Sequence, residues 1–158
     1  MSELRQLEFI PGTEIGEFDE EFVKKTETMI NLKFPPDFVE FLKKHNGGAL
    51  KQRYFKLDSN VKVLETFLAV VPDYKNHPRG ELDIGVVWTW IEDRLNDYLL
   101  PFAAVYPGDY LCFDYENSDP PKVVLWIHDQ SEENEPATEP VAGSFAQFLG
   151  MLTDDKNG

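Results

Sequence analysis

Cysteine and long apolar runs are nearly absent from this chain of 158 residues. A single cysteine, Cys112, excludes an intramolecular disulfide and any zinc site built on several cysteines. The first seven residues, Met-Ser-Glu-Leu-Arg-Gln-Leu, lack the apolar core of a secretory signal. No run approaches the roughly 20 apolar residues that cross a bilayer. These absences predict a cytoplasmic protein.

Basic residues are also scarce, and the scarcity is confined to the second half of the chain. The formal charge is −14, of which residues 1–79 contribute −1 and residues 80–158 contribute −13. The second half holds 16 acids but only three bases. Without clustered Lys and Arg, binding to nucleic acid or to an anionic membrane is disfavoured. A field of one sign attracts cationic partners, although acidity can also serve solubility alone.

The chain nevertheless has the composition of a folded protein. Hydrophobic residues make up 42% and aromatic residues 13%, which excludes a disordered acidic chain. Its length suits one domain with a sizeable core, and no internal repeat or long linker divides it. We therefore expect a single domain over residues 1–158.

Two helices are predicted in the first third of the chain. Apolar residues at helical spacing indicate one over about residues 18–33, and Pro35-Pro36 ends it because a proline disfavours helical backbone at the preceding residue. Pro36 then opens the second helix, where its missing N–H costs nothing. Asn46-Gly47-Gly48 tolerates the left-handed conformation that closes a helix.

The rest of the chain predicts mainly strands. Two strands are expected within residues 50–71, and a helix is expected at 83–98 after a loop. Three more strands should follow, at 101–105, 110–115 and 122–128. A polar segment at 130–140 then leads to a last helix, which begins at the capping box of Ser144 and Gln147. Helices at both ends of a strand meander predict an α+β fold. We expect one mainly antiparallel, curved sheet flanked by N-terminal helices and a C-terminal helix.

Catalytic motifs are missing from the sequence. There is no G-x-S-x-G elbow, Gly-rich phosphate loop, H-E-x-x-H helix or EF-hand loop. The best enzymatic alternative groups Cys112 with His128 and Asp129, which could form a thiol nucleophile, a base and an orienting carboxylate. A lone cysteine, however, is usually buried, and surrounding acids would raise the pKa of the thiol. We therefore expect neither catalysis nor a cofactor.

A metal site is likewise not expected. Asp109, Asp114, Asp129 and the acids within Glu132–Glu139 could attract a hard cation through their oxygens. They lack the ordered spacing of a calcium loop, and the three histidines are far apart in sequence. A solvated acidic face explains them better.

Five segments form an ordered set of motifs: Glu27–Phe38, Phe41-Leu42 with Asn46-Gly47-Gly48, Leu100–Ala103 with Gly108-Asp109-Tyr110, Val123–Asp129, and Gly143–Leu149. This set resembles the SUKH superfamily, which groups the fungal cell-wall-assembly regulator with many bacterial proteins. Asn31 stands where the superfamily has glycine, a change that Asn tolerates because it also adopts positive φ. Residues 50–80 show no match.

The resemblance implies a binding protein. Bacterial members of the superfamily typically act as immunity proteins that neutralise a cognate polymorphic toxin, often a nuclease, encoded beside them. A nuclease needs a basic groove to hold phosphates, so an acidic surface would complement it. We expect an intracellular immunity protein without catalysis, whose partner is a basic nuclease toxin domain. A regulatory scaffold like the fungal relative is the alternative, the Cys/His enzyme is less favoured, and a homodimer stays open.

The expected partner-binding residues are acids of the second half: Asp109, Asp114, Glu116, Asp119, Asp129, Glu132, Glu133 and Glu135. An aromatic anchor is the other candidate. Trp88 lies off the apolar stripe of the expected third helix and should be exposed, whereas Trp90 should widen that stripe.

Overall fold

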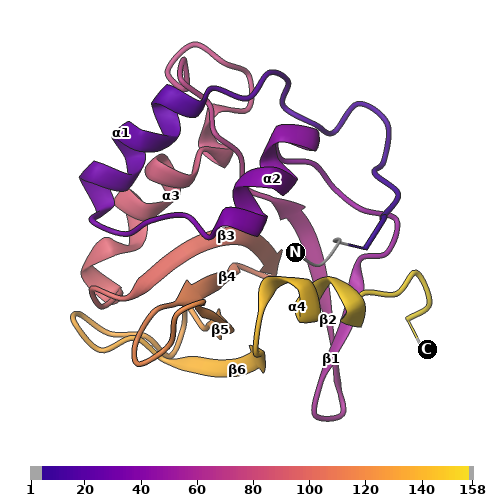
Figure 1. Ribbon diagram of the computed structural model, residues 1–158. Helices are drawn as coiled ribbons and strands as arrows, with labels where there is room; N and C mark the ends of the chain where they lie inside the picture. Colours follow the sequence, from indigo (N-terminus) through magenta and orange to yellow (C-terminus); the bar gives the residue numbers. More distant parts are fainter. Residues whose placement is uncertain (1–4, 157–158) are drawn as a thin grey trace.

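The computed structural model describes residues 5–156 (Figure 1). Its helices are α1 (Glu20–Ile30), α2 (Pro36–Lys44), α3 (Ile84–Ile91) and α4 (Phe145–Met151), with short 3₁₀ turns η1 (Gly80–Leu82) and η2 (Glu92–Arg94). Its strands are β1 (Tyr54–Leu57), β2 (Asn60–Phe67), β3 (Leu99–Tyr106), β4 (Asp109–Asp114), β5 (Lys122–Trp126) and β6 (Thr138–Ala142). None of the helices in this part of the chain is long and apolar enough to cross a membrane.

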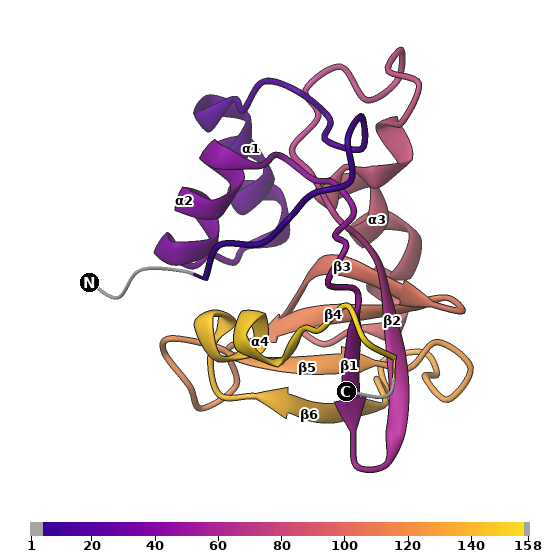
Figure 2. The ribbon, with the colours of Figure 1, turned by 90° about the vertical axis from the view of Figure 1, so that its right-hand side faces the viewer.

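The six strands form one antiparallel meander in the order β1-β2-β3-β4-β5-β6. The sheet is strongly curved, nearly barrel-like, and β1 and β2 run steeply across the direction of β3–β6 (Figure 2). Both views place α1, α2 and α3 together on one side, with the β1–β2 hairpin pointing away from them. The α+β prediction is confirmed.

Aromatic packing holds α2 and α4 against the sheet. The ring of Phe38 on α2 lies 5.6 Å from Phe102, 5.1 Å from Phe113 and 5.4 Å from Phe145 between centroids, and all four side chains are buried. Consecutive residues of β4 and β5 are also buried, which requires cover on both faces. On the second face Trp126 is fully buried beneath η2, and its indole N–H donates to the carbonyl of Arg94 at 3.0 Å.

Local signals set the ends of the first two helices. Asp19 caps α1 by accepting from the N–H of Phe22 at 3.1 Å. Asn31 has the positive φ expected of it, 65°, but it also ends the helix, before the Pro35-Pro36 pair that was expected to do so. The end of α2 differs from expectation, because its cap His45 is extended. Gly47 and Gly48 do have positive φ, and a Cβ on Gly47 would lie 2.9 Å from that of Ala69. These glycines therefore serve a close backbone approach rather than the helix cap.

Two elements differ from the sequence prediction. The third helix ends at Ile91 instead of residue 98, and η2 turns the chain toward β3. The polar segment at 130–140 also contains most of β6, a half-exposed strand at the edge of the sheet, where Pro140 is tolerated. A register shift between Val123 and Val124 accommodates the pairing of β5 with β6. An exposed edge strand has only a weak alternation of apolar and polar residues, so the sequence pattern did not predict β6.

Candidate functional site

The structure separates the eight predicted acids into two groups at opposite ends of β4. Asp109 and the β5–β6 loop, which carries Asp129 and the three glutamates, lie at one end. Asp114, Glu116 and Asp119 lie at the other, where β4 passes into β5. From Asp109 to Asp114 an extended chain covers about 17 Å. The fold therefore does not place all eight acids on one compact surface.

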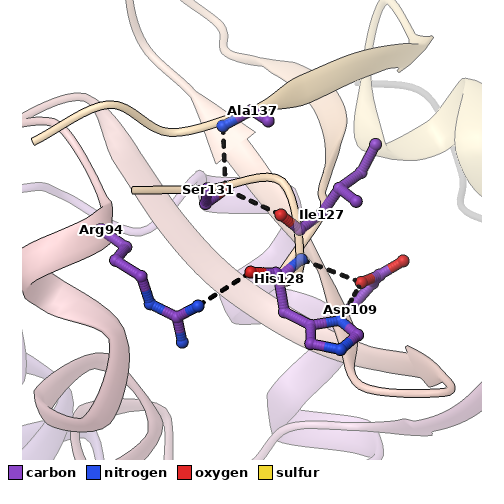
Figure 3. Close-up of polar contacts among 6 residues, drawn as sticks. All are labelled: Arg94, Asp109, Ile127, His128, Ser131 and Ala137. Atoms are coloured by element: carbon purple, nitrogen blue, oxygen red, sulfur yellow. Dashed lines mark hydrogen bonds and ion pairs between the residues drawn. The ribbon is translucent and has the colours of Figure 1, made fainter. Parts of the chain in front are cut away.

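The loop between β5 and β6 is tightly built (Figure 3). The hydroxyl of buried Ser131 donates to the carbonyl of Ile127 and accepts from the N–H of Ala137, both at 2.8 Å. Glu132 and Glu135 exchange two backbone hydrogen bonds of 3.0 and 2.9 Å. The carboxylates on this loop are exposed, but the backbone that bears them is fixed.

Contacts with η2 tie this loop to the helical side of the molecule. The N–H of Asn134 donates to the carbonyl of Asp93 at 2.7 Å, and Arg94 donates to the carbonyl of His128 at 2.8 Å. The guanidinium of Arg94 also lies 5.0 Å from the ring centroid of Trp126. These contacts bring two further exposed acids, Glu92 and Asp93, beside the loop.

We call the six exposed carboxylates of this region the acidic end: Glu92, Asp93, Asp129, Glu132, Glu133 and Glu135. Sequence reasoning missed the first two because residues 92–94 were assigned to the interior of a longer helix. Their charge was visible in the sequence, but their place beside a loop 40 residues later depends on tertiary contacts.

Asp109 differs from the other predicted acids because it is buried, with 7% of its surface exposed. One carboxylate oxygen accepts from the backbone N–H of His128 at 3.0 Å and pairs with its Nδ1 at 2.6 Å (Figure 3). Gly108 has φ 128° and sits against this ring, since a Cβ there would lie 3.3 Å from His128. Asp109 thus positions the start of the loop instead of facing a partner.

The opposite end, which we call the far end, comprises Asp114, Glu116 and Asp119. Asp114 accepts from the N–H of Glu116 at 2.9 Å, and Ser118 donates to the carbonyl of Pro120 at 2.7 Å. These bonds join residues only two positions apart. Basic residues lie close by as well. Lys122 is the cross-strand partner of Asp114, and the hydroxyl of Tyr115 donates to the carbonyl of Lys33.

A family model described as "SMI1-KNR4 cell-wall" (SUKH_6) matches residues 20–149. The chain belongs to the SUKH family. The match runs from the start of α1 into α4, so it covers both ends of the sheet and also residues 50–80, where no motif was evident. The chain is also 25% identical over 154 residues to the SPbeta prophage-derived uncharacterized protein YokK of Bacillus subtilis (strain 168), covering 85% of this chain and 74% of that protein. The SUKH family includes immunity proteins.

The SUKH fold does not assemble the Cys112, His128 and Asp129 group. Cys112 is fully buried opposite Val124, and burial, with a smaller effect of the Asp114 charge, raises the pKa of its thiol far above the usual value. His128 pairs with Asp109, while Asp129 is exposed. Over residues 5–156 no hydrogen bond joins Cys112 to His128, so the thiol has neither a base nor access to solvent.

The part of the chain that the structure describes also contains no cluster of side chains suited to binding a metal ion. No group of three or more His, Cys, Asp or Glu side chains there is arranged to hold one. The carboxylates of the acidic end are spread over a surface. That arrangement suits contact with an extended partner.

Proposed function

We propose that this SUKH protein is an immunity protein that acts inside the cell by binding and neutralising a cognate toxin, a basic nuclease domain, without catalysis. The observation that carries the proposal is the acidic end, a set of exposed carboxylates on η2 and on a loop whose backbone is fixed by hydrogen bonds, in a member of a family that includes immunity proteins. It supports a binding role because it offers charge and shape without a reactive group.

The rigidity of the loop favours binding. A surface that is already ordered loses little conformational freedom when a partner docks, so more of the interaction energy appears as affinity. A nuclease that binds phosphates with Lys and Arg offers the complementary charge. Opposite potentials speed encounter and exclude partners of the wrong sign.

The acidic end suits this role better than the far end. Its neighbouring base, Arg94, is partly buried, over the ring of Trp126 and bonded to the carbonyl of His128, so a neutral backbone group takes up part of its hydrogen-bonding capacity. At the far end Lys122 lies directly opposite Asp114 and offsets part of the negative charge. The proposed toxin-binding surface is therefore centred on the β5–β6 loop and η2.

Charge reversal tests the proposal. We expect that replacing Glu132, Glu133 and Glu135 together by Lys lowers the association rate with the toxin domain encoded beside this gene at least ~10-fold at low salt, and by less at high salt. Association is measured at several salt concentrations, and neutralisation is scored as rescue of growth on co-expression.

The matched control reverses three acids at the far end, Asp114, Glu116 and Asp119, and is expected to leave binding nearly unchanged. Equal affinity of the Glu132/Glu133/Glu135 variant at low salt would contradict the location. Failure of the wild-type protein to bind the neighbouring toxin domain or rescue growth would overturn the immunity function. It would favour the regulatory scaffold, to which the "cell-wall" description of the family model points.

A further inference from the structure

Large apolar side chains gather in a cleft between α1 and α3. Five such side chains are exposed in residues 5–156, and three of them line this cleft: Met29 is 49% exposed, Tyr74 37% and Trp90 55%. The cleft has a volume of about 400 Å³. A concentration of exposed apolar surface of this kind marks an interaction site more often than scattered single residues do.

Rigid elements build the cleft. On α1, the side chains of Phe22, Lys25, Thr26 and Met29 follow helical spacing along the wall. On α3, Gly85 lets the side chain of Met29 pack close to the helix backbone, because a Cβ at Gly85 would lie 3.1 Å from the terminal carbon of Met29. The packing of α1 against α3 therefore sets most of the cleft, and Tyr74 completes it from the turns after Val71.

The interior of the cleft suits an uncharged group. Its only charged lining residues are Lys25 and Asp83. Asp83 is 2% exposed, and its two oxygens accept from the N–H groups of Val71 at 2.8 Å and Val86 at 3.1 Å. Burial raises the pKa of this carboxyl, in keeping with its inward position. No exposed carboxylate lines the cleft, so a basic side chain gains nothing by entering it.

The cleft is continuous with the acidic end along the chain. Trp90 occupies the last turn of α3, and Glu92 and Asp93 follow at once in η2. Asp93 then meets the β5–β6 loop through the N–H of Asn134. An apolar pocket bordered by charged residues has the layout of a protein interface, with a desolvated centre and a polar rim.

We propose that the α1–α3 cleft is the apolar centre of the toxin-binding surface and takes an apolar side chain from the partner, whose surrounding surface is basic. Trp90 is its anchor residue. This inference rests on the proposed function and deepens it, because charges mainly speed association whereas buried aromatic anchors slow dissociation. The acidic end and the cleft should therefore affect different rate constants.

Kinetics with the toxin domain encoded beside the gene test the inference. Trp90→Ala is expected to raise the dissociation rate at least ~10-fold and to change the association rate less than ~2-fold. The matched control is Tyr98→Ala, which removes an aromatic ring that is 46% exposed outside the cleft and should change neither rate. Circular dichroism verifies that each variant is folded.

The outcomes separate the two proposals. If wild-type protein does not bind the toxin domain, both the proposed function and the inference about the cleft are refuted. If wild-type protein binds and Trp90→Ala dissociates at the wild-type rate, only the cleft inference is overturned. Should Trp90→Ala not fold, Met29→Lys on the opposite wall must show the same faster dissociation, because it places an unpaired charge where the partner's apolar side chain has to be buried.

Discussion

The acidic end and the far end carry the same kind of side chain, yet they are held in different ways. At the acidic end, Asp109 ties the β5–β6 loop to β4, Arg94 ties it to η2, and Ser131 closes the loop on itself. At the far end the side-chain bonds of Asp114 and Ser118 span only two residues, and the long-range bond there is made by Tyr115, which donates to the carbonyl of Lys33. Carboxylates become a defined surface where long-range contacts fix the backbone that bears them. The difference should appear in the stability of variants at the two ends.

Trp126 supports the acidic end, because its ring packs under the guanidinium of Arg94 and its indole N–H donates to the Arg94 carbonyl. Trp126→Ala is expected to cost about 3–5 kcal/mol of unfolding free energy, through lost burial and the cavity left behind. Urea unfolding measures this cost. Tyr106→Ala, at a residue that is 64% exposed at the end of β3, serves as the control and should change little. A cost below about 1 kcal/mol would refute this supporting role.

The two ends of β4 provide a matched pair of aspartates. Asp109→Ala leaves the N–H of His128 without its acceptor and should cost about 2 kcal/mol. Asp114→Ala removes a more exposed local bond to Glu116 and should cost below about 0.5 kcal/mol. Thermal unfolding of the two variants side by side measures the difference. Equal costs would mean that the two ends are anchored alike.

Ser131 and Ser118 provide a matched pair of serine hydroxyls, one at the acidic end and one at the far end. Ser131→Ala removes the partner of the Ala137 N–H and is expected to cost about 1.5 kcal/mol. Hydrogen exchange at Ala137 should speed up at the same time, since its amide loses protection. Ser118→Ala, which removes a local bond to Pro120, is the control for the far end. Unchanged exchange at Ala137 in Ser131→Ala would show that the loop does not depend on this hydroxyl.

Cys112 lies in the strand between the two ends, and its substitution should have only a small effect. Cys112→Ala should cost about 1 kcal/mol of stability and leave rescue of growth unchanged, because the thiol is buried. In the folded wild-type protein a thiol reagent should label Cys112 slowly, and urea should accelerate labelling. Loss of rescue by a stable Cys112→Ala protein would reopen the thiol-enzyme alternative.

Local sequence signals predicted much of the fold correctly. Ser144 accepts from the N–H of Gln147 and opens α4, and Asn31 has the positive φ that it was expected to tolerate. The side chain of Gln147 bonds back to Gly143, one residue earlier than a standard capping box requires. Such signals work because the interacting groups are within a few residues of one another.

The two tryptophans of α3 show where local reasoning failed. Trp88 was expected to be exposed, but it packs against the core, whereas Trp90 is exposed. The expected stripe was right at Val87 and Ile91, which are buried, but it was widened toward Trp90 when the structure widens it toward Trp88. In the short helix that forms, Ile84, Val87 and Ile91 face inward, and Trp88 adjoins them at helical spacing.

By itself the sequence determined the class of fold, the family motifs, and the concentration of negative charge after residue 79. Only the tertiary structure decided which acids share a surface, because that depends on contacts between residues far apart in the chain. It buried Asp109 beneath His128, divided the other predicted acids between two ends, and brought Glu92 and Asp93 to the β5–β6 loop. Charge is a property of composition, whereas a binding surface is a property of packing.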